Sequence, residues 1–243
     1  MKRIYLSLLL ISAFVLVGCS DQIVTKFYPS ENYVIRYQDP QSSYAAVYGS
    51  IDEYPVHSQS VVQFMINLRV TESTTNSLSY DVIDRKTDVT RFKELAQKFN
   101  DTEYNKINFN PPPPVMYVQS ESLNIVSDQD YDATHPAGSS LNDLFLVKYA
   151  SVDHILQNHY DLTPTEQQMK LGLYVWQFME SVDEFNQRQP TLVGFDFWFY
   201  PTEFPTGNKQ HQFTITYKNV EGKELVATTL PVLILEQEAA PNP

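Results

Sequence analysis

The chain has 243 residues, of which 29 are acidic and 17 are basic, so its formal net charge at pH 7 is −12. This excess of negative charge opposes binding to nucleic acids and acidic polysaccharides. The single cysteine excludes an intramolecular disulfide, and the length suffices for one large domain or two small ones with a real core.

The N-terminus has the pattern of a signal peptide. Two basic residues precede an apolar stretch, Ile4 to Val17, that is too short for a comfortable transmembrane helix. It ends in Leu16-Val17-Gly18-Cys19, which resembles a bacterial lipobox. The resemblance implies that residues 1–18 are removed, that the thiol of Cys19 is lipidated and that the new N-terminus is acylated. The alternative is an ordinary cleaved signal peptide with an incidental cysteine.

A lipidated Cys19 predicts the location of the protein. Each buried methylene of an acyl chain contributes about 0.8 kcal/mol, so two or three chains hold a protein on a membrane. We therefore predict a lipid-anchored protein of the cell envelope, at the outer membrane, on its periplasmic or its surface face. Residues 19–32 then form a tether, and the folded part contains no thiol for a metal site or a nucleophile.

The first strands follow the tether. A short strand is expected near 33–37. Alternation of apolar and polar residues then predicts a strand along residues 62–70 and a second strand with Leu78, Tyr80 and Val82, joined to the first by a polar turn at 72–76. The two are expected to be neighbours in one sheet.

A helix is predicted from Asp88 to Phe99, where apolar residues recur at helical spacing and Asp88 is placed to cap the first turn. The prolines of 111–114 predict an extended connector, because proline has no backbone N–H to donate. Strand character returns at 115–117 and 123–125.

Two further helices are expected in the second half. Ser140 to Asp143 has the spacing of a capping box and predicts a short helix before an extended stretch at 145–149. Thr163-Pro164-Thr165-Glu166 predicts a helix start, continued by apolar residues at helical spacing as far as Val182. The alternative is that this helix ends at Gly172 and gives way to a strand.

The C-terminal third has the clearest strand pattern. Val193, Phe195, Phe197 and Phe199 alternate with Gly194, Asp196, Trp198 and Tyr200, and paired strands follow on both sides of a turn at Gly222. The predicted fold is mainly β (α+β): a two-layer antiparallel β-sandwich with two or three peripheral helices. One globular domain is expected over residues 33–236, followed by a frayed tail at 237–243.

Residues 127–145, SDQDYDATHPAGSSLNDLF, resemble a central signature of Bacteroidetes-type envelope lipoproteins whose activity is uncharacterised. The resemblance covers this segment and the C-terminal third. It implies an envelope location and no particular chemistry. In that group, acidic residues soon after the lipidated cysteine favour export to the outer surface, and here Asp21 is the only acidic residue among 20–25.

Three carboxylates in this segment have metal-ligand spacing. Asp128, Asp130 and Asp132 match the first ligands of a calcium loop, but Ala133 stands where that loop needs glycine and Ser139 stands where it needs a glutamate. We predict no cofactor and expect these side chains to cap backbone turns. A calcium ion bound in another geometry is the alternative.

Enzyme motifs are weak. A separation of five residues places His154 and His159 on different faces of a helix or a strand, so they cannot bind one zinc ion from a regular element. Ser139 with nearby His135 is the nearest imitation of a hydrolase nucleophile, but the G-x-S-x-G turn is absent. Lone histidines such as His211 are expected to be structural and partly exposed.

Aromatic residues provide the last candidate site. Trp198 and Tyr200 lie on the strand face opposite the phenylalanines and form a possible platform for sugar rings, although cross-strand packing explains such residues as well. The sequence predicts a non-enzymatic envelope lipoprotein that binds a partner protein or a glycan. The alternative is a secreted hydrolase acting on polysaccharide or peptide.

Overall fold

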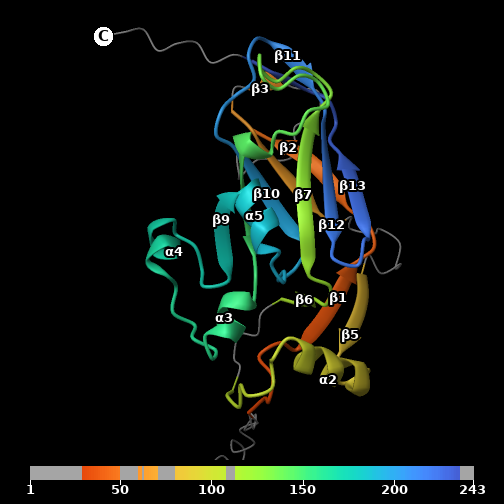
Figure 1. Cartoon of the computed structure of the whole chain (residues 1–243), viewed down its shortest axis with the longest axis vertical. Coiled ribbons are helices and arrows are strands. Elements are labelled where there is room, and N and C mark those ends of the chain that lie inside the picture. Colours follow the sequence, from red (N-terminus) through yellow and green to blue (C-terminus); the bar gives the residue numbers. More distant parts are fainter. Residues whose placement is uncertain (1–28, 50–59, 62, 71–79, 108–112, 236–243) are drawn as a thin grey trace, which may run out of the picture.

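The computed structural model describes residues 29–49, 60–61, 63–70, 80–107 and 113–235. The predicted signal peptide, Cys19, most of the tether and the C-terminal tail lie outside these residues. The described part is mainly β with four short α-helices, arranged as packed sheets (Figure 1). The predicted fold class, a mainly β sandwich with peripheral helices, is confirmed.

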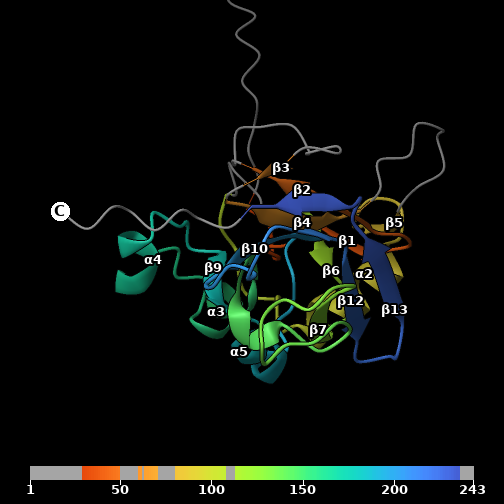
Figure 2. The same cartoon turned by 90° about the horizontal axis from the view of Figure 1, so that it is seen from above.

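Two antiparallel sheets form the sandwich. The first has five strands in the order β2 (Tyr44–Tyr48), β4 (Met65–Arg69), β10 (Asp196–Pro201), β8 (Phe145–Ala150) and β9 (Gln177–Ser181). The second has three strands in the order β13 (Glu224–Thr228), β12 (Phe213–Asn219) and β7 (Ser120–Ser127). Figure 2 shows the two layers from above.

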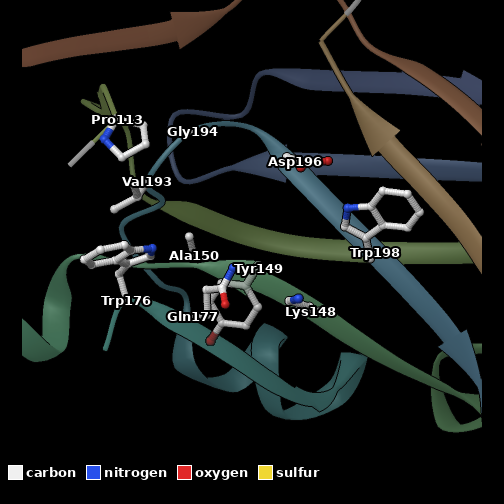
Figure 3. A pocket seen from close by; sticks show the side chains of 10 residues that line it. All are labelled: Pro113, Lys148, Tyr149, Ala150, Trp176, Gln177, Val193, Gly194, Asp196 and Trp198. Carbon is white, nitrogen blue, oxygen red and sulfur yellow. The ribbon is translucent and has the colours of Figure 1, made fainter. Parts of the chain in front are cut away.

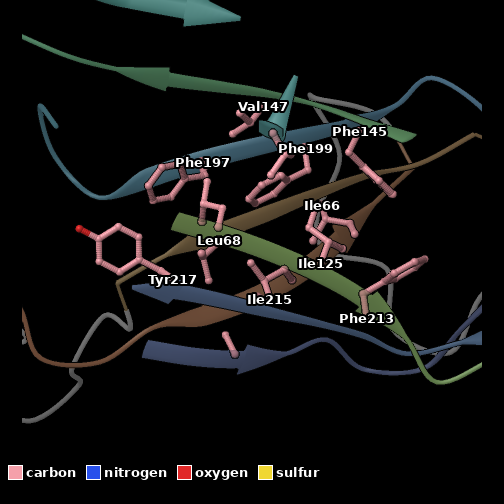
Figure 4. Close-up of a cluster of buried hydrophobic side chains, with 14 of the residues drawn as sticks. Ile66, Leu68, Ile125, Phe145, Val147, Phe197, Phe199, Phe213, Ile215 and Tyr217 are labelled. Atoms are coloured by element: carbon pink, nitrogen blue, oxygen red, sulfur yellow. The ribbon is translucent and has the colours of Figure 1, made fainter. Parts of the chain in front are cut away.

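The core lies between these sheets and is rich in aromatic rings. Phe195, Phe197 and Phe199 face inward as their alternation predicts, and each is at most 2% exposed. Tyr217 of β12 meets Phe195 edge-on at a centroid distance of 4.9 Å and therefore joins the two layers. Figure 4 shows this cluster. Burial of such large apolar side chains is the main driving force for folding.

A smaller sheet closes each end of the sandwich. One has the order β11 (Lys209–His211), β14 (Val232–Ile234), β3 (Ser60–Val61); the other has the order β5 (Tyr80–Asp84), β1 (Arg36–Pro40), β6 (Val115–Met116). The latter packs with helix α2 (Val89–Lys98) around a second cluster of buried side chains, including Tyr37 and Phe92. The pairs β1–β6 and β14–β3 are parallel, unlike the expected antiparallel pairing.

The remaining helices lie around the edge strands. Helix α5 (Val182–Arg188) contacts β7, β8 and β9 and so closes one side of the sandwich, while β13 approaches β2 on the other side. Helices α3 (Asp153–Gln157) and α4 (Glu166–Lys170) belong to the connection between β8 and β9, and the 3-10 turn η1 (Asn142–Leu144) precedes β8.

Some local predictions were wrong. Strand β5 pairs with β1 and not with β4, because its buried Ile83 packs in the second cluster. The helix expected at Ser140 is only η1. The Ser140 hydroxyl donates to the side chain of Asn124 and accepts a hydrogen bond of 3.4 Å from the backbone N–H of Asn142, the first residue of η1.

The third predicted helix is also shorter than its pattern suggested. It is capped by Thr165, two residues later than expected, and ends at Lys170. Gly172 then takes a φ of +66°, which ends the helical path, and β9 follows at Gln177. The alternative, a helix that gives way to a strand, is therefore confirmed.

Candidate functional site

The outer face of the five-stranded sheet carries the candidate site. Asp196, Trp198 and Tyr200 of β10 point away from the core, since side chains alternate along a strand. Trp198 lies directly between Asn67 of β4 and Lys148 of β8 in the strand register. The predicted platform residues thus share one face at the centre of the sheet.

A cavity of about 310 Å³ opens on this face, and we call it the tryptophan cavity (Figure 3). Its volume is at the lower end of the range of small-molecule sites. It is lined by residues from β8, β9, β10 and the segments before β6, β9 and β10: Pro113, Lys148, Tyr149, Ala150, Trp176, Gln177, Val193, Gly194, Asp196 and Trp198. Tyr200 is outside it, so only one of the two predicted platform residues contributes.

Both tryptophans of the chain line this cavity. Figure 3 shows Trp176 and Trp198 at opposite ends, with Lys148, Gln177 and Asp196 between them. Each indole is partly exposed, and the ring of Tyr174 stacks on Trp176 at a centroid distance of 5.7 Å. The helix predicted through Trp176 hid this arrangement, because a helical Trp176 would face a core and not the sheet surface.

The polar groups of the cavity supply both a donor and an acceptor. Within the described part of the chain, Lys148 has no ion-pair partner, so its ammonium is available. Oδ1 of Asp196 accepts a hydrogen bond of 2.6 Å from the Asn67 amide, which orients the carboxylate. The alternation of Lys148 with buried Val147 and Tyr149 was the sequence signal that could have placed it on this face.

Gln177 connects the wall of the tryptophan cavity to Tyr174 at its rim and to Gln168 of α4. Its backbone carbonyl accepts a hydrogen bond from the side chain of Gln168, and its own Oε1 accepts one of 3.3 Å from the backbone N–H of Tyr174. These bonds connect the segment before β9, which carries Trp176, to both α4 and the sheet.

A second cavity of about 220 Å³ lies between α4 and β9. The ion pair of Arg188 with Glu180, 2.6 Å long, lies in its wall, and Glu180 also accepts a hydrogen bond from the Tyr149 hydroxyl. Because these charged groups already satisfy one another, this cavity offers a ligand less free polar capacity than the tryptophan cavity.

The three aspartates with metal-ligand spacing have separate partners. Asp128 accepts from the backbone N–H of Gln212, Asp130 from that of Ala137, and Asp132 from those of Thr134 and His135. The carboxylates thus cap backbone groups in the way the turn interpretation expects. Across the described ranges, no group of three or more His, Cys, Asp or Glu side chains is placed to hold a metal ion.

Among the residues that the structure describes, the serine and histidine candidates for a hydrolase do not meet at an accessible position. Ser139 hydrogen-bonds through its hydroxyl to the carbonyl of Pro136, and not to His135. Ser127 does meet His211, with Oγ 2.9 Å from Nδ1, but both residues are buried, at 2% and 0% exposure. The expectation of a partly exposed His211 was wrong, because His211 is stacked on Phe213 and faces Tyr131. Burial lowers the pKa of His211, which favours the neutral ring.

His154 and His159, which the sequence raised as a pair of zinc ligands, do not lie on one regular element. His154 lies in α3, whereas His159 follows that helix with a φ of +52°. His57 and Cys19 lie outside the described residues.

None of the helices in the described ranges is long and apolar enough to cross a lipid bilayer. Comparisons of the chain with models of protein families, with curated proteins and with solved structures found no match.

Proposed function

We propose that this protein is a cell-envelope lipoprotein, anchored through Cys19, whose folded body binds a glycan in the tryptophan cavity. The observation that supports this most directly is that Trp176 and Trp198, the two tryptophans of the chain, line one cavity together with Lys148, Gln177 and Asp196. The proposed anchor rests on the lipobox-like sequence and places the cavity outside the cytoplasm.

A sugar ring matches this set of side chains. The C–H groups on one face of a pyranose pack against an indole and bury apolar area, while its hydroxyl groups require donors and acceptors around the rim. The Lys148 ammonium can donate to a sugar hydroxyl, and the Asp196 oxygen that is not bonded to Asn67 can accept from a neighbouring one.

Binding is better supported than hydrolysis. Glycoside hydrolysis uses two carboxyl groups about 5 Å or about 6.5–9.5 Å apart, and Asp196 is the one carboxylate among the residues that line the tryptophan cavity. The Ser127–His211 pair does not support a serine hydrolase, because a substrate cannot reach a serine that is 2% exposed.

The test is a glycan array probed with the full chain, kept in a detergent without a sugar headgroup. Binding should also change the intrinsic fluorescence, since both tryptophans lie in the cavity. Trp198→Ala should weaken binding about thirtyfold or more, because truncating a tryptophan at the centre of a binding site costs about 2 kcal/mol or more.

Tyr200→Ala is the matched control, because Tyr200 lies on the same strand and the same face but outside the cavity. It should leave affinity within about twofold. Binding of no glycan on the array, or equal losses in the Trp198 and Tyr200 variants, would contradict the proposed function.

A further inference from the structure

The two ends of the tryptophan cavity differ in exposure. Towards β2, Trp198 packs against Tyr48 with a centroid distance of 5.2 Å, and Tyr48 is only 7% exposed. Asn67, which lies beside Trp198 on β4, is 1% exposed. Directly beside Trp198, these two neighbours therefore offer a ligand almost no accessible surface.

The opposite end is open. Tyr174 is 65% exposed, and its ring lies nearly parallel to that of Trp176, with an interplanar angle of 16°. The backbone N–H of Tyr174 is bonded to Gln177, which holds the ring pair at the rim. The stacked rings of Tyr174 and Trp176 thus extend the aromatic surface out of the cavity at this end.

The cavity itself, at about 310 Å³, has room for a small part of a longer ligand. We infer that it holds the end residue of a glycan chain, between Trp176 and Trp198, and that the following residues of the chain leave over Tyr174. This inference rests on the proposed function and adds that a chain end is recognised, with Tyr174 determining the preference for longer chains.

The experiment compares ligand lengths. Each glycan bound on the array is titrated as the methyl glycoside of its terminal sugar and as linear oligosaccharides of increasing length with that same end, using tryptophan fluorescence of the full chain. Affinity should rise with the second and third sugar. Tyr174→Ala should remove most of that rise, about five- to tenfold, and leave the affinity for the methyl glycoside within twofold.

Two further variants distinguish stacking from a general disturbance of the rim. Tyr174→Phe keeps the ring and should behave as the unchanged chain, whereas Trp198→Ala should weaken all ligand lengths alike. Circular dichroism and the melting temperature check that each variant is folded.

Three results would overturn the inference. One is an equal loss for all lengths in Tyr174→Ala, and another is unchanged binding when the free end of the bound glycan is extended by an unrelated sugar. Both leave the proposed function intact. Binding of no glycan on the array overturns the proposed function and this inference together.

Discussion

At the scale of single residues, His135 shows what sequence spacing misses. It stands in a loop as one of five histidines, yet its ring bridges two carboxylates: Nδ1 lies 2.8 Å from Asp132 and Nε2 lies 3.2 Å from Asp143. The hydrogen bond to Asp132 raises the pKa of His135 above its usual value. Hydrogen bonds from Thr134 and His135 outweigh partial desolvation and lower the pKa of Asp132 to about 2.

These pKa directions predict a pH dependence of stability. A raised histidine pKa stabilises the folded state fully below about pH 6.5, the value in the unfolded chain, and this contribution is lost as the pH rises through the folded-state pKa. The lowered pKa of Asp132 stabilises the folded state above about pH 4, and this stabilisation is lost as the pH falls towards 2. His135→Asn should therefore lower the melting temperature at pH 5–6 and bring it closer to that of the unchanged chain above pH 8.

His211 behaves in the opposite way, because burial lowers its pKa. Its contribution to the stability of the folded state is therefore lost as the pH falls. A side-chain NMR titration should show His135 titrating above, and His211 below, an ordinary histidine. An unchanged pH profile in His135→Asn would contradict the assignment of the alkaline loss to His135.

At the scale of elements, the segment from α4 to β9 depends on one buried side chain. Gln168 is 3% exposed and donates hydrogen bonds to the carbonyls of Val175 and Gln177, while its Oε1 accepts from the Thr165 backbone N–H. A short helix of five residues has little stability of its own, so these bonds hold it against the sheet. They also fix the position of Trp176.

Gln168→Ala should lower the free energy of unfolding by about 2 kcal/mol, because it leaves buried carbonyl groups without donors. It should also weaken glycan binding, since Trp176 loses its support. Hydrogen exchange over residues 162–177 should become faster. Gln167→Ala, on the exposed side of the same helix, is the control and should leave hydrogen exchange unchanged. Equal exchange rates over residues 162–177 in the two variants would exclude this role for Gln168.

At the scale of the whole molecule, the two buried clusters share their strands. On β8, Tyr149 belongs to the sandwich core and Ala150 contacts the second cluster. On β6, Met116 belongs to the sandwich core and Val115 belongs to the second cluster. Isolated bridges, Val115 with Val193 and Ser151 with Leu192, tie the segments between them. A break in one cluster therefore disturbs strands of the other, which favours one cooperative unit.

Phe92→Ala in the second cluster and Phe197→Ala in the sandwich core should each cost about 3–5 kcal/mol, since both rings are buried. Each should shift one common thermal transition, measured by circular dichroism and calorimetry. The milder Phe→Leu variants serve where the alanine variants do not fold, and Leu162→Ala, at 48% exposure, is the surface control. Two separated transitions would show that the clusters unfold independently.

Local patterns predicted much of the architecture but less of the candidate site. The alternation at Phe195, Phe197 and Phe199 sufficed to place Trp198 on the outer face of a strand. The spacing of Met169, Leu173 and Trp176 suggested a continued helix, and the helix ended earlier because Gly172 takes a left-handed backbone conformation. Helical and strand periodicities overlap in such short apolar series, so the choice between them depends on tertiary contacts.

The amino-acid order alone determined the lipobox-like N-terminus, the acidic charge, the inward and outward faces of the strands, and the residues available for chemistry, because these properties depend on composition or on neighbours along the chain. The tertiary structure alone decided that Lys148, Trp176, Asp196 and Trp198 line one cavity and that Tyr48 packs against Trp198 at one end of it. These residues come from separate strands and connections, and strand order in a sheet is set by the packing of the whole core, which no local pattern encodes.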